Sequence, residues 1–401
     1  MRNIIITGGE LFNKGAQAMT YIAVDECKKR FPDHEVLVLS PMDLKRTEEE
    51  KNQYTFRFIG WYPLKFATAQ SNPVLKILCS IRNRNEFREC EAIYRNCDLL
   101  IDISGYALGS NWNYAYCNQY LEHLEFAKAY NIPVCLMPQS FGPFDFPKEY
   151  SNSINKRIED LLSYVKIIMA REKEGRDALI DKYNLNNVQL EKDLVLNNTG
   201  IELSRIFKRE QDIRRIQVEK DSVGIVPNKR LLDTVDENEL LLCYREVISY
   251  LIMHGKNVYI MSHASADQII CQNIYDLFTA SERVHLIRTE LSCIEYNEIV
   301  KKMSFMIASR FHAIVHAYKE GVPCIAIGWA IKYTDLLSEF GQQNYIFDTS
   351  IVQKPSDILE KIEYIDQHLD EEKSKILEHL AEVQEKNVFD ALTGIIKHHE
   401  N

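Results

Sequence analysis

The sequence predicts an α/β protein of two Rossmann-like domains, each built on a parallel sheet, that face each other across a cleft. The chain has 401 residues, which is too long for a single ordinary core. Short apolar segments alternate with helix-length amphipathic segments in two successive series, and a polar, charged stretch separates the series. We therefore expect an N-terminal domain over residues 1–200, a linker over 201–220 and a C-terminal domain over 221–401.

The first predicted strand ends at Gly8 and Gly9, and a loop leads from it to a helix that begins near Gly15. Glycines between a strand and a helix let backbone N–H groups approach a ligand closely. The glycine spacing is not that of a dinucleotide-binding loop. Asn13 is the hydrogen-bonding side chain here, and a plain tight turn with a helix cap explains the pattern equally well. A second strand at 36–39 completes a βαβ unit, so the sheet is expected to be parallel.

An insertion at residues 43–90 is both aromatic and basic. Between Lys51 and Arg88 there are seven Lys or Arg and one acidic residue, in a chain of net charge -10. Basic residues mixed with aromatic ones suit an anionic membrane surface or a lipid-diphosphate acceptor. This composition predicts peripheral membrane contact through residues 51–88. An insertion helix packed on the domain, with a solvated basic face, is the alternative.

Three more strands are predicted in the first domain, over 98–103, 134–137 and 167–170. Small, polar and charged residues gather where they end, as a substrate cleft at the carboxyl edge of a sheet requires: Asp102, Gln139, Ser140 and Arg171. An ion pair of Arg171 with Glu172 or Glu174 is the alternative explanation of that arginine.

The second domain begins at a strand over 222–226 and contains the most informative stretch of the chain, Ser309-Arg310-Phe311-His312-Ala313. An apolar strand precedes this stretch and a helix follows it. Arg310 offers a fork of donors for a carboxylate or phosphate, and the helix N-terminus adds N–H groups for the same anion. Lys332 follows the next strand. His263 also lies just past a strand end, where it is either structural or functional. Amphipathic helices are expected from residue 356 onward.

Bulk properties exclude several classes of protein. A net charge of -10 argues against nucleic-acid binding, which needs a basic face. The N-terminus enters a strand at once, without a signal peptide, and no apolar run approaches the roughly 20 residues that span a bilayer. The ten cysteines form no Cys-x-x-Cys pair and are expected to be reduced, buried thiols. These features predict a cytoplasmic protein. The membrane contact predicted for residues 51–88 would then be at the inner face of the membrane.

Two facing parallel-sheet domains are the architecture called GT-B among glycosyltransferases. Within that architecture the chain resembles the polysaccharide pyruvyl transferases. The motifs that carry the resemblance occur in the family's order between about residues 4 and 335: Gly8-Gly9, Asn13-Lys14-Gly15-Ala16-Gln17-Ala18, Pro138 to Pro143, Arg171-Glu172, Asp193, Ser309 to Ala313, Gly321-Val322-Pro323 and Lys332. The chain departs from the pattern at Ser104-Gly105-Tyr106 and at Gly175, which differences in acceptor preference would explain.

The resemblance implies transfer of pyruvate from phosphoenolpyruvate to a sugar, as a cyclic ketal. Phosphoenolpyruvate carries a carboxylate and a phosphate, and Arg310, Arg171 and Lys332 are the cations available to bind it. His312 is the candidate general acid that protonates the methylene carbon, and its pKa is expected near neutrality. His263 is the candidate base, with Asp102 or Glu10 behind it. The residues expected to bind the acceptor are Asn13, Gly9, Gly15, Asp102, Gln139 and Ser140.

No metal and no cofactor beyond the co-substrate phosphoenolpyruvate are expected. His312 and His316 are four residues apart, but the Glu of His-Glu-x-x-His is absent, and His316 fits a packed core position. Two other functions stay open because the fold could host them. One is a glycosyltransferase that uses a nucleotide sugar, and the other is a non-catalytic subunit that binds sugar or lipid carrier in a polysaccharide assembly complex.

Overall fold

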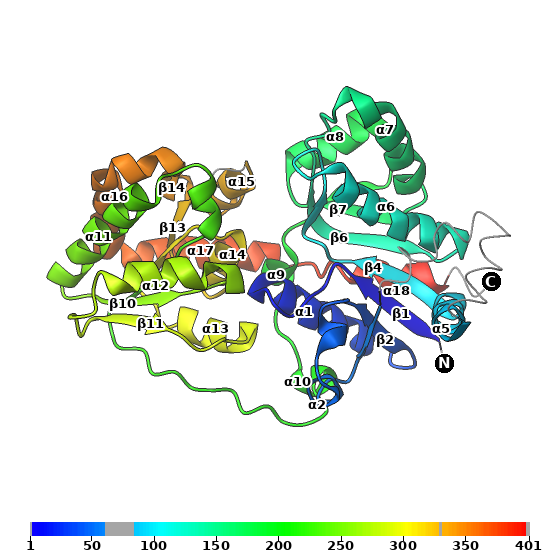
Figure 1. Cartoon of the computed structure of the whole chain (residues 1–401), viewed down its shortest axis with the longest axis horizontal. Helices are drawn as coiled ribbons and strands as arrows, with labels where there is room; N and C mark the ends of the chain where they lie inside the picture. The colour runs from blue at the N-terminus through cyan, green and yellow to red at the C-terminus, as the bar shows by residue number, and fades with distance from the viewer. Residues whose placement is uncertain (1, 61–83, 329–330, 398–401) are drawn as a thin grey trace.

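The computed structural model describes residues 2–60, 84–328 and 331–397, and it has two α/β lobes (Figure 1). The first lobe is built on an eight-stranded sheet whose pairings are all parallel, in the order β3-β2-β1-β4-β6-β7-β8, with β5 paired to β6. Its strands are β1 Asn3–Thr7, β2 Glu35–Leu39, β3 Arg57–Ile59, β4 Cys97–Asp102, β5 Tyr106–Leu108, β6 Val134–Phe141, β7 Ile167–Ala170 and β8 Val188–Leu190. Its helices are α1 Lys14–Arg30, η1 Asp43–Lys45, α2 Glu48–Asn52, α5 Arg84–Arg95, α6 Tyr114–Ala129, α7 Lys148–Leu162, α8 Lys173–Tyr183, α9 Leu194–Asn197 and α10 Leu203–Ile206.

The second lobe contains a six-stranded, fully parallel sheet in the order β11-β10-β9-β12-β13-β14. Its strands are β9 Ser222–Val226, β10 Asn257–Met261, β11 Val284–Ile287, β12 Phe305–Ala308, β13 Cys324–Ile327 and β14 Ile346–Phe347. Its helices are η2 Lys229–Asp233, α11 Glu237–Met253, η3 Ser265–Asp267, α12 Gln268–Asp276, α13 Cys293–Val300, α14 Phe311–Lys319, α15 Ile331–Glu339, η4 Gln343–Tyr345, η5 Thr349–Gln353, α16 Pro355–Gln367 and α17 Leu369–Val383.

The strands form where apolar residues run continuously, because both faces of each sheet are covered by helices. β1, β4, β9 and β12 are buried along their whole length. β6 is longer than the sequence predicts, since it continues through Pro138 to Phe141. Its register against β7 shifts between Leu136 and Gln139, and proline is tolerated in a strand at such an irregularity.

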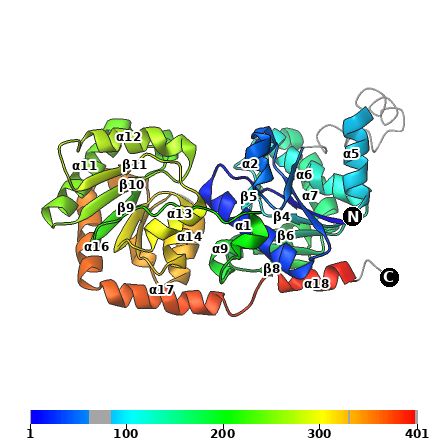
Figure 2. The same cartoon turned by 90° about the horizontal axis from the view of Figure 1, so that it is seen from below.

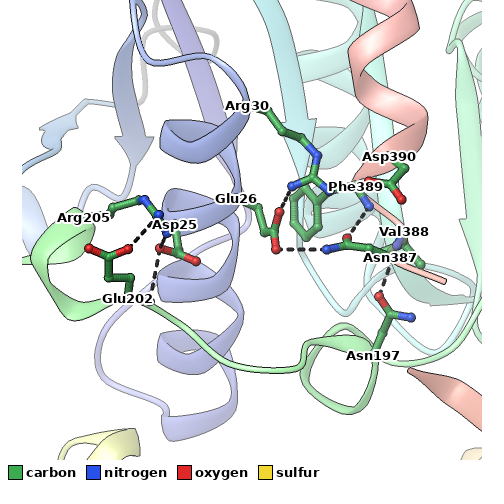
Figure 3. Close-up of polar contacts among 10 residues, drawn as sticks. All are labelled: Asp25, Glu26, Arg30, Asn197, Glu202, Arg205, Asn387, Val388, Phe389 and Asp390. Carbon is green, nitrogen blue, oxygen red and sulfur yellow. Dashed lines mark hydrogen bonds and ion pairs between the residues drawn. The ribbon is translucent and has the colours of Figure 1, made fainter. Parts of the chain in front are cut away.

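The C-terminal chain returns to the first lobe. α17 runs along one side of the molecule and the last helix, α18 Asp390–Lys397, packs beneath the first sheet (Figure 2). Asn197 accepts a hydrogen bond from the backbone N–H of Val388, and Asn387 donates to Glu26 over 3.0 Å (Figure 3). Arg30 pairs with both Glu26 and Asp390. Two separate crossings therefore join the lobes, this one and the chain that leads from α10 to β9.

The two lobes also contact each other directly through α1 at the front of the first lobe. Asn13 forms an antiparallel bridge with Ala264, and the backbone N–H of Cys293 donates to the side chain of Gln17 over 2.6 Å. The ring of His312 packs on Gly15, where an added Cβ would lie 2.3 Å from the ring carbon Cγ. Glycine is required at this position because no larger residue leaves room for the histidine.

The central part of the predicted insertion lies outside the described residues, so the proposed membrane contact through residues 51–88 is largely there as well. Among the described residues no helix is long and apolar enough to cross a membrane. The cysteines in the described ranges are free and buried.

Candidate functional site

A cleft of about 1170 Å³ lies between the lobes, and residues from both of them line it. In each sheet the strand order reverses at one point, between β1 and β4 in the first lobe and between β9 and β12 in the second. Loops that leave neighbouring strands at such a switch point diverge and open a crevice for a ligand. Glu10 and Ser104 follow β1 and β4, and Arg230 and Arg310 follow β9 and β12, and all four line the cleft.

Most of the residues predicted from the sequence line this cleft. Those that do so are Gly9, Asn13, Asp102, Ser140, Arg171, His263, Arg310, His312 and Lys332, together with Glu10. Gly15 and Gln139 do not, although both touch residues that do. Gly15 supports the ring of His312, and Gln139 is fully buried and donates to Asp102 over 3.1 Å. The side chain of Asn13 caps α1 by accepting from the N–H of Gly15.

His312 is in the first turn of α14 and reaches across to the first lobe. Its Nε2 lies 3.8 Å from Oδ2 of Asp193, and the side chain is 17% exposed. The pKa of His312 is lowered to about 4, chiefly by burial; Asp193 opposes this shift, and the positive charges of Arg171 and Lys332 add to it. The imidazole of His312 is therefore neutral at pH 7, and its pKa is lower than the near-neutral value expected from the sequence.

Arg171 is almost completely buried; both of its Nη atoms donate to protein groups, and its Nε lies 3.8 Å from Oε1 of Glu172 without a hydrogen bond. Nη1 donates to Asp193 over 2.7 Å, and Nη2 donates to the hydroxyl of Ser140 and to the carbonyl of Gly105. Its guanidinium also lies 4.8 Å from the ring centroid of Phe311 in the other lobe. Burial alone would raise the pKa of Asp193, but Arg171 and His312 hold it below its usual range. Arg171 thus holds Asp193 in place, and Asp193 in turn lies next to His312.

Arg310 is also paired within the protein. Its Nε and Nη2 donate to the two oxygens of Asp267 over 2.8 and 2.5 Å, a bidentate pair. Asp267 is fully buried and also accepts from the backbone N–H groups of Lys229 and Ala264. This one carboxylate therefore connects the loops after β9, β10 and β12.

Lys332 is the predicted cation that has no ion pair among the described residues. Its ammonium lies 5.1 Å from the ring centroid of Phe311, 5.7 Å from that of Tyr106 and 6.0 Å from that of Tyr333. Burial lowers the pKa of Lys332 to about 8, and the charges of Arg171 and Arg230 contribute to the shift. A cation held by aromatic faces and without a carboxylate is available to an anionic ligand.

The two cleft carboxylates of the first lobe, Asp102 and Glu10, differ in how they are bound. Asp102 is buried and accepts hydrogen bonds from Thr7, Gln139 and both the backbone and the hydroxyl of Ser104. Burial raises its pKa. Glu10 is half-buried, has no hydrogen bond or ion pair in the described part of the chain, and has its pKa raised by burial and by Asp43.

His263 is 1% exposed, and its ring lies 5.4 Å from that of Tyr296 and 5.7 Å from that of His316. Burial holds its pKa well below the usual value. His316 is fully buried, as the sequence analysis expected. Within the described ranges, no three His, Cys, Asp or Glu side chains come close enough together to hold a metal ion.

Two features of the cleft were not predicted from the sequence. One is an aromatic wall on the first lobe, and the other is a cation opposite it on the second lobe. Trp112 stacks on Tyr116 with ring centroids 4.5 Å apart and contacts Tyr106 at 5.6 Å. Arg230 of the second lobe lies with its guanidinium carbon 5.8 Å from the Trp112 ring centroid. The signal for Arg230 was its place just after Asn228 at the end of a strand, the same signal that identified Arg310. Asp193 was noted only within a motif, and its contact with His312 depends on how the lobes meet.

Comparison with protein families and solved structures bears on these assignments. The model of the family described as polysaccharide pyruvyl transferase matches residues 13–330, which include the whole region from the Asn13 loop to the end of β13. No curated protein sequence gives a significant match.

Among solved structures, UDP-GlcNAc 2-epimerase from Neisseria meningitidis bound to UDP-GlcNAc matches with a TM-score of 0.60 and 12% identity, covering 99% of this chain and 100% of the other. A glycosyltransferase from Rickettsia africae ESF-5 has a TM-score of 0.53 and 12% identity, covering 99% and 98%. The trehalose-6-phosphate synthase OtsA has a TM-score of 0.55 and 8% identity, covering 98% and 99%. At these identities the likeness establishes the fold, which is GT-B.

Proposed function

The chain belongs to the polysaccharide pyruvyl transferase family, and we propose that it moves the enolpyruvyl group of phosphoenolpyruvate onto two hydroxyls of a sugar. The acceptor belongs to a surface polysaccharide or to its lipid-linked precursor, the product is a pyruvate ketal, and phosphate is released. The observation that carries the proposal is the pairing of Lys332 with His312 in the cleft, since a cation without an ion pair among the described residues stands beside a general acid–base group.

The reaction balances without any oxidant or metal. A proton added to the methylene carbon of phosphoenolpyruvate turns it into a methyl group and leaves positive charge on the neighbouring carbon. One sugar hydroxyl attacks that carbon and loses its proton. The bond between this carbon and the bridging oxygen then breaks, phosphate leaves, and a second hydroxyl closes the ketal ring. The two hydroxyls give up one proton each: one of these replaces the proton that the acid gave to the methylene carbon, and the other leaves on the released phosphate.

His312 is the proposed donor of the first proton. The positive charges of Arg171 and Lys332 contribute to its low pKa of about 4. A bound carboxylate and phosphate bring negative charge to the same place and offset these cations, so binding of the donor favours protonation of the imidazole. Asp193 stabilises the imidazolium from the other side. Binding of the substrate thus increases the fraction of His312 that carries the proton.

A base near the acceptor hydroxyl is also needed, and Glu10 fits better than His263 or Asp102. Glu10 lines the cleft, is half-buried and has a raised pKa, and a carboxylate with a raised pKa accepts a proton more readily. His263 is 1% exposed, and the oxygens of Asp102 already accept several hydrogen bonds.

The test is phosphate release from phosphoenolpyruvate, with and without acceptors that contain galactose, glucose or N-acetylmannosamine. Release that depends on one acceptor supports the proposal and identifies the acceptor class. If no acceptor causes release, and a nucleotide sugar raises the melting temperature while phosphoenolpyruvate does not, a glycosyltransferase activity replaces pyruvyl transfer.

A further inference from the structure

We propose that Arg230 is the second cation of the phosphoenolpyruvate site and that it binds phosphoenolpyruvate together with Lys332. This inference rests on the proposed function. It assigns a binding role to a residue outside the motifs that place the chain in its family, and it changes which side chains meet the anionic groups of the substrate.

The location of Arg230 supports this role. It lies in η2, directly after β9, at the point where the strand order of the second sheet reverses. Its backbone N–H donates to the side chain of Asn228, whose amide in turn donates to the carbonyl of Ser309 over 3.0 Å. The backbone that carries Arg230 is therefore tied to the loop that carries Arg310 and His312. A long side chain on such an anchored base can reach a ligand in the crevice.

The balance of charge in the cleft requires a cation beyond Lys332. Phosphoenolpyruvate presents two anionic groups, a carboxylate and a phosphate. Arg310 already binds Asp267 in a bidentate pair, and Arg171 binds Asp193, Ser140 and Gly105. The charge of each of these two arginines is therefore offset by a buried carboxylate, and only their remaining N–H groups, such as those on Nη1 of Arg310, are left for a substrate. Arg230 is exposed, lines the cleft and has no ion pair with any residue that the structure describes.

Arg230 and Lys332 are near enough to act on one small molecule. The charge of Arg230 contributes to the lowered pKa of Lys332, which is the effect of two cations that share a site. Both also lie over the same aromatic wall of the first lobe, Arg230 over Trp112 and Lys332 over Tyr106. A contact with a ring face uses none of the N–H groups of Arg230, so these groups are free to form a fork with a carboxylate or phosphate.

The experiment compares Arg230→Ala with Lys229→Ala as the matched control. Lys229 is adjacent, exposed and equally charged, but it does not line the cleft. Steady-state kinetics are measured with phosphoenolpyruvate and acceptor varied in turn, and direct binding of phosphoenolpyruvate is measured by calorimetry. Arg230→Ala is expected to raise the KM and Kd for phosphoenolpyruvate at least about tenfold, as loss of hydrogen bonds to a charged group predicts, with the acceptor KM unchanged. Arg230→Lys should recover part of the loss, because it restores charge but not the fork.

Turnover of phosphoenolpyruvate by the wild-type protein distinguishes a failure of the proposed function from a failure of the role proposed for Arg230. Without it the proposed function fails, whatever Arg230 does. With it, an unchanged KM for phosphoenolpyruvate in Arg230→Ala overturns the inference, and so does a rise confined to the acceptor KM, which would move Arg230 to the acceptor subsite. An equal rise in KM for Lys229→Ala would mean that the two side chains act only by general electrostatic attraction, and this outcome would also overturn the inference about Arg230. Melting temperatures of both variants should match the wild type, since neither side chain has an ion pair among the described residues.

Discussion

The two walls of the cleft hold their charges in different ways. On the first lobe, Arg171, Asp193 and Asp102 are buried and bound by protein groups on several sides. On the second lobe, Asp267 holds Arg310 in a similar way, but Lys332 and Arg230 have aromatic neighbours and no ion pair in the part of the chain that the structure describes. Fixed networks position groups, whereas unpaired cations bind anions. In the proposed reaction, the first wall would therefore orient the reacting groups, and Lys332 and Arg230 of the second wall would bind the donor.

His312 belongs to the second lobe, and its ring lies next to Asp193 of the first wall. Because His312 is the proposed general acid, replacing it should lower turnover more than the other changes do. In His312→Ala we expect turnover to fall by about 100- to 10,000-fold, the range for loss of a general acid, while the fold is retained. His254→Ala, which removes an exposed histidine at the end of α11, is the control and should leave turnover unchanged. Phosphate release and circular dichroism provide the two measurements. Turnover within tenfold of wild type in His312→Ala would remove this residue from the mechanism.

Asp193→Asn tests whether the first wall is a fixed network. Asparagine can still cap α9, so the change isolates the charge. It removes the nearer carboxylate of the buried Arg171 guanidinium and leaves only that of Glu172, 3.8 Å from Nε, so we expect a loss of about 3–5 kcal/mol of stability together with lower turnover. Asp160→Asn, which breaks an exposed pair with Lys128, should cost at most about 1 kcal/mol. Urea denaturation compares the two, and equal costs would show that the network is not what holds the wall in place.

The pH dependence of donor binding tests the second wall. Lys332 has a pKa of about 8, so it carries its charge below that pH and loses it as the pH rises through 8. We expect kcat/KM for phosphoenolpyruvate to fall by up to about tenfold for each further pH unit. Lys332→Arg should move this decline to higher pH, because arginine stays charged. A decline that remains near pH 8 in Lys332→Arg would assign it to another group.

Much of the fold could be predicted because fully buried parallel strands are continuous apolar runs, and β1, β2, β9, β10 and β12 lie where those runs occur. The short edge strands β3 and β14 and the extension of β6 through Pro138 were not predicted. Their formation depends on neighbouring strands rather than on local pattern. The return of α18 to the first lobe likewise depends on long-range contacts, such as those of Asn197 with Lys386 and Val388.

The candidate site could be located from the sequence but not resolved into roles. Their positions just after strands predicted that Arg310, Arg171 and Lys332 lie at one cleft, and all three line it in the structure. Which of them are already paired could not be predicted, because Asp267 is 43 residues from Arg310 and Asp193 is 22 from Arg171. The wall formed by Trp112 and Tyr116 was missed for a related reason, since its relation to Arg230 exists only once two lobes face each other.

The most direct test of the account is the reaction in D₂O with phosphoenolpyruvate labelled with ¹³C at its central carbon. Protonation of the methylene carbon followed by ketal closure predicts a product in which the labelled carbon is bonded to two sugar oxygens and the new methyl group carries one deuterium. Mass spectrometry and NMR of the purified product read both features. A product that keeps a vinyl group, or label that stays entirely in phosphoenolpyruvate with every acceptor, would contradict the account.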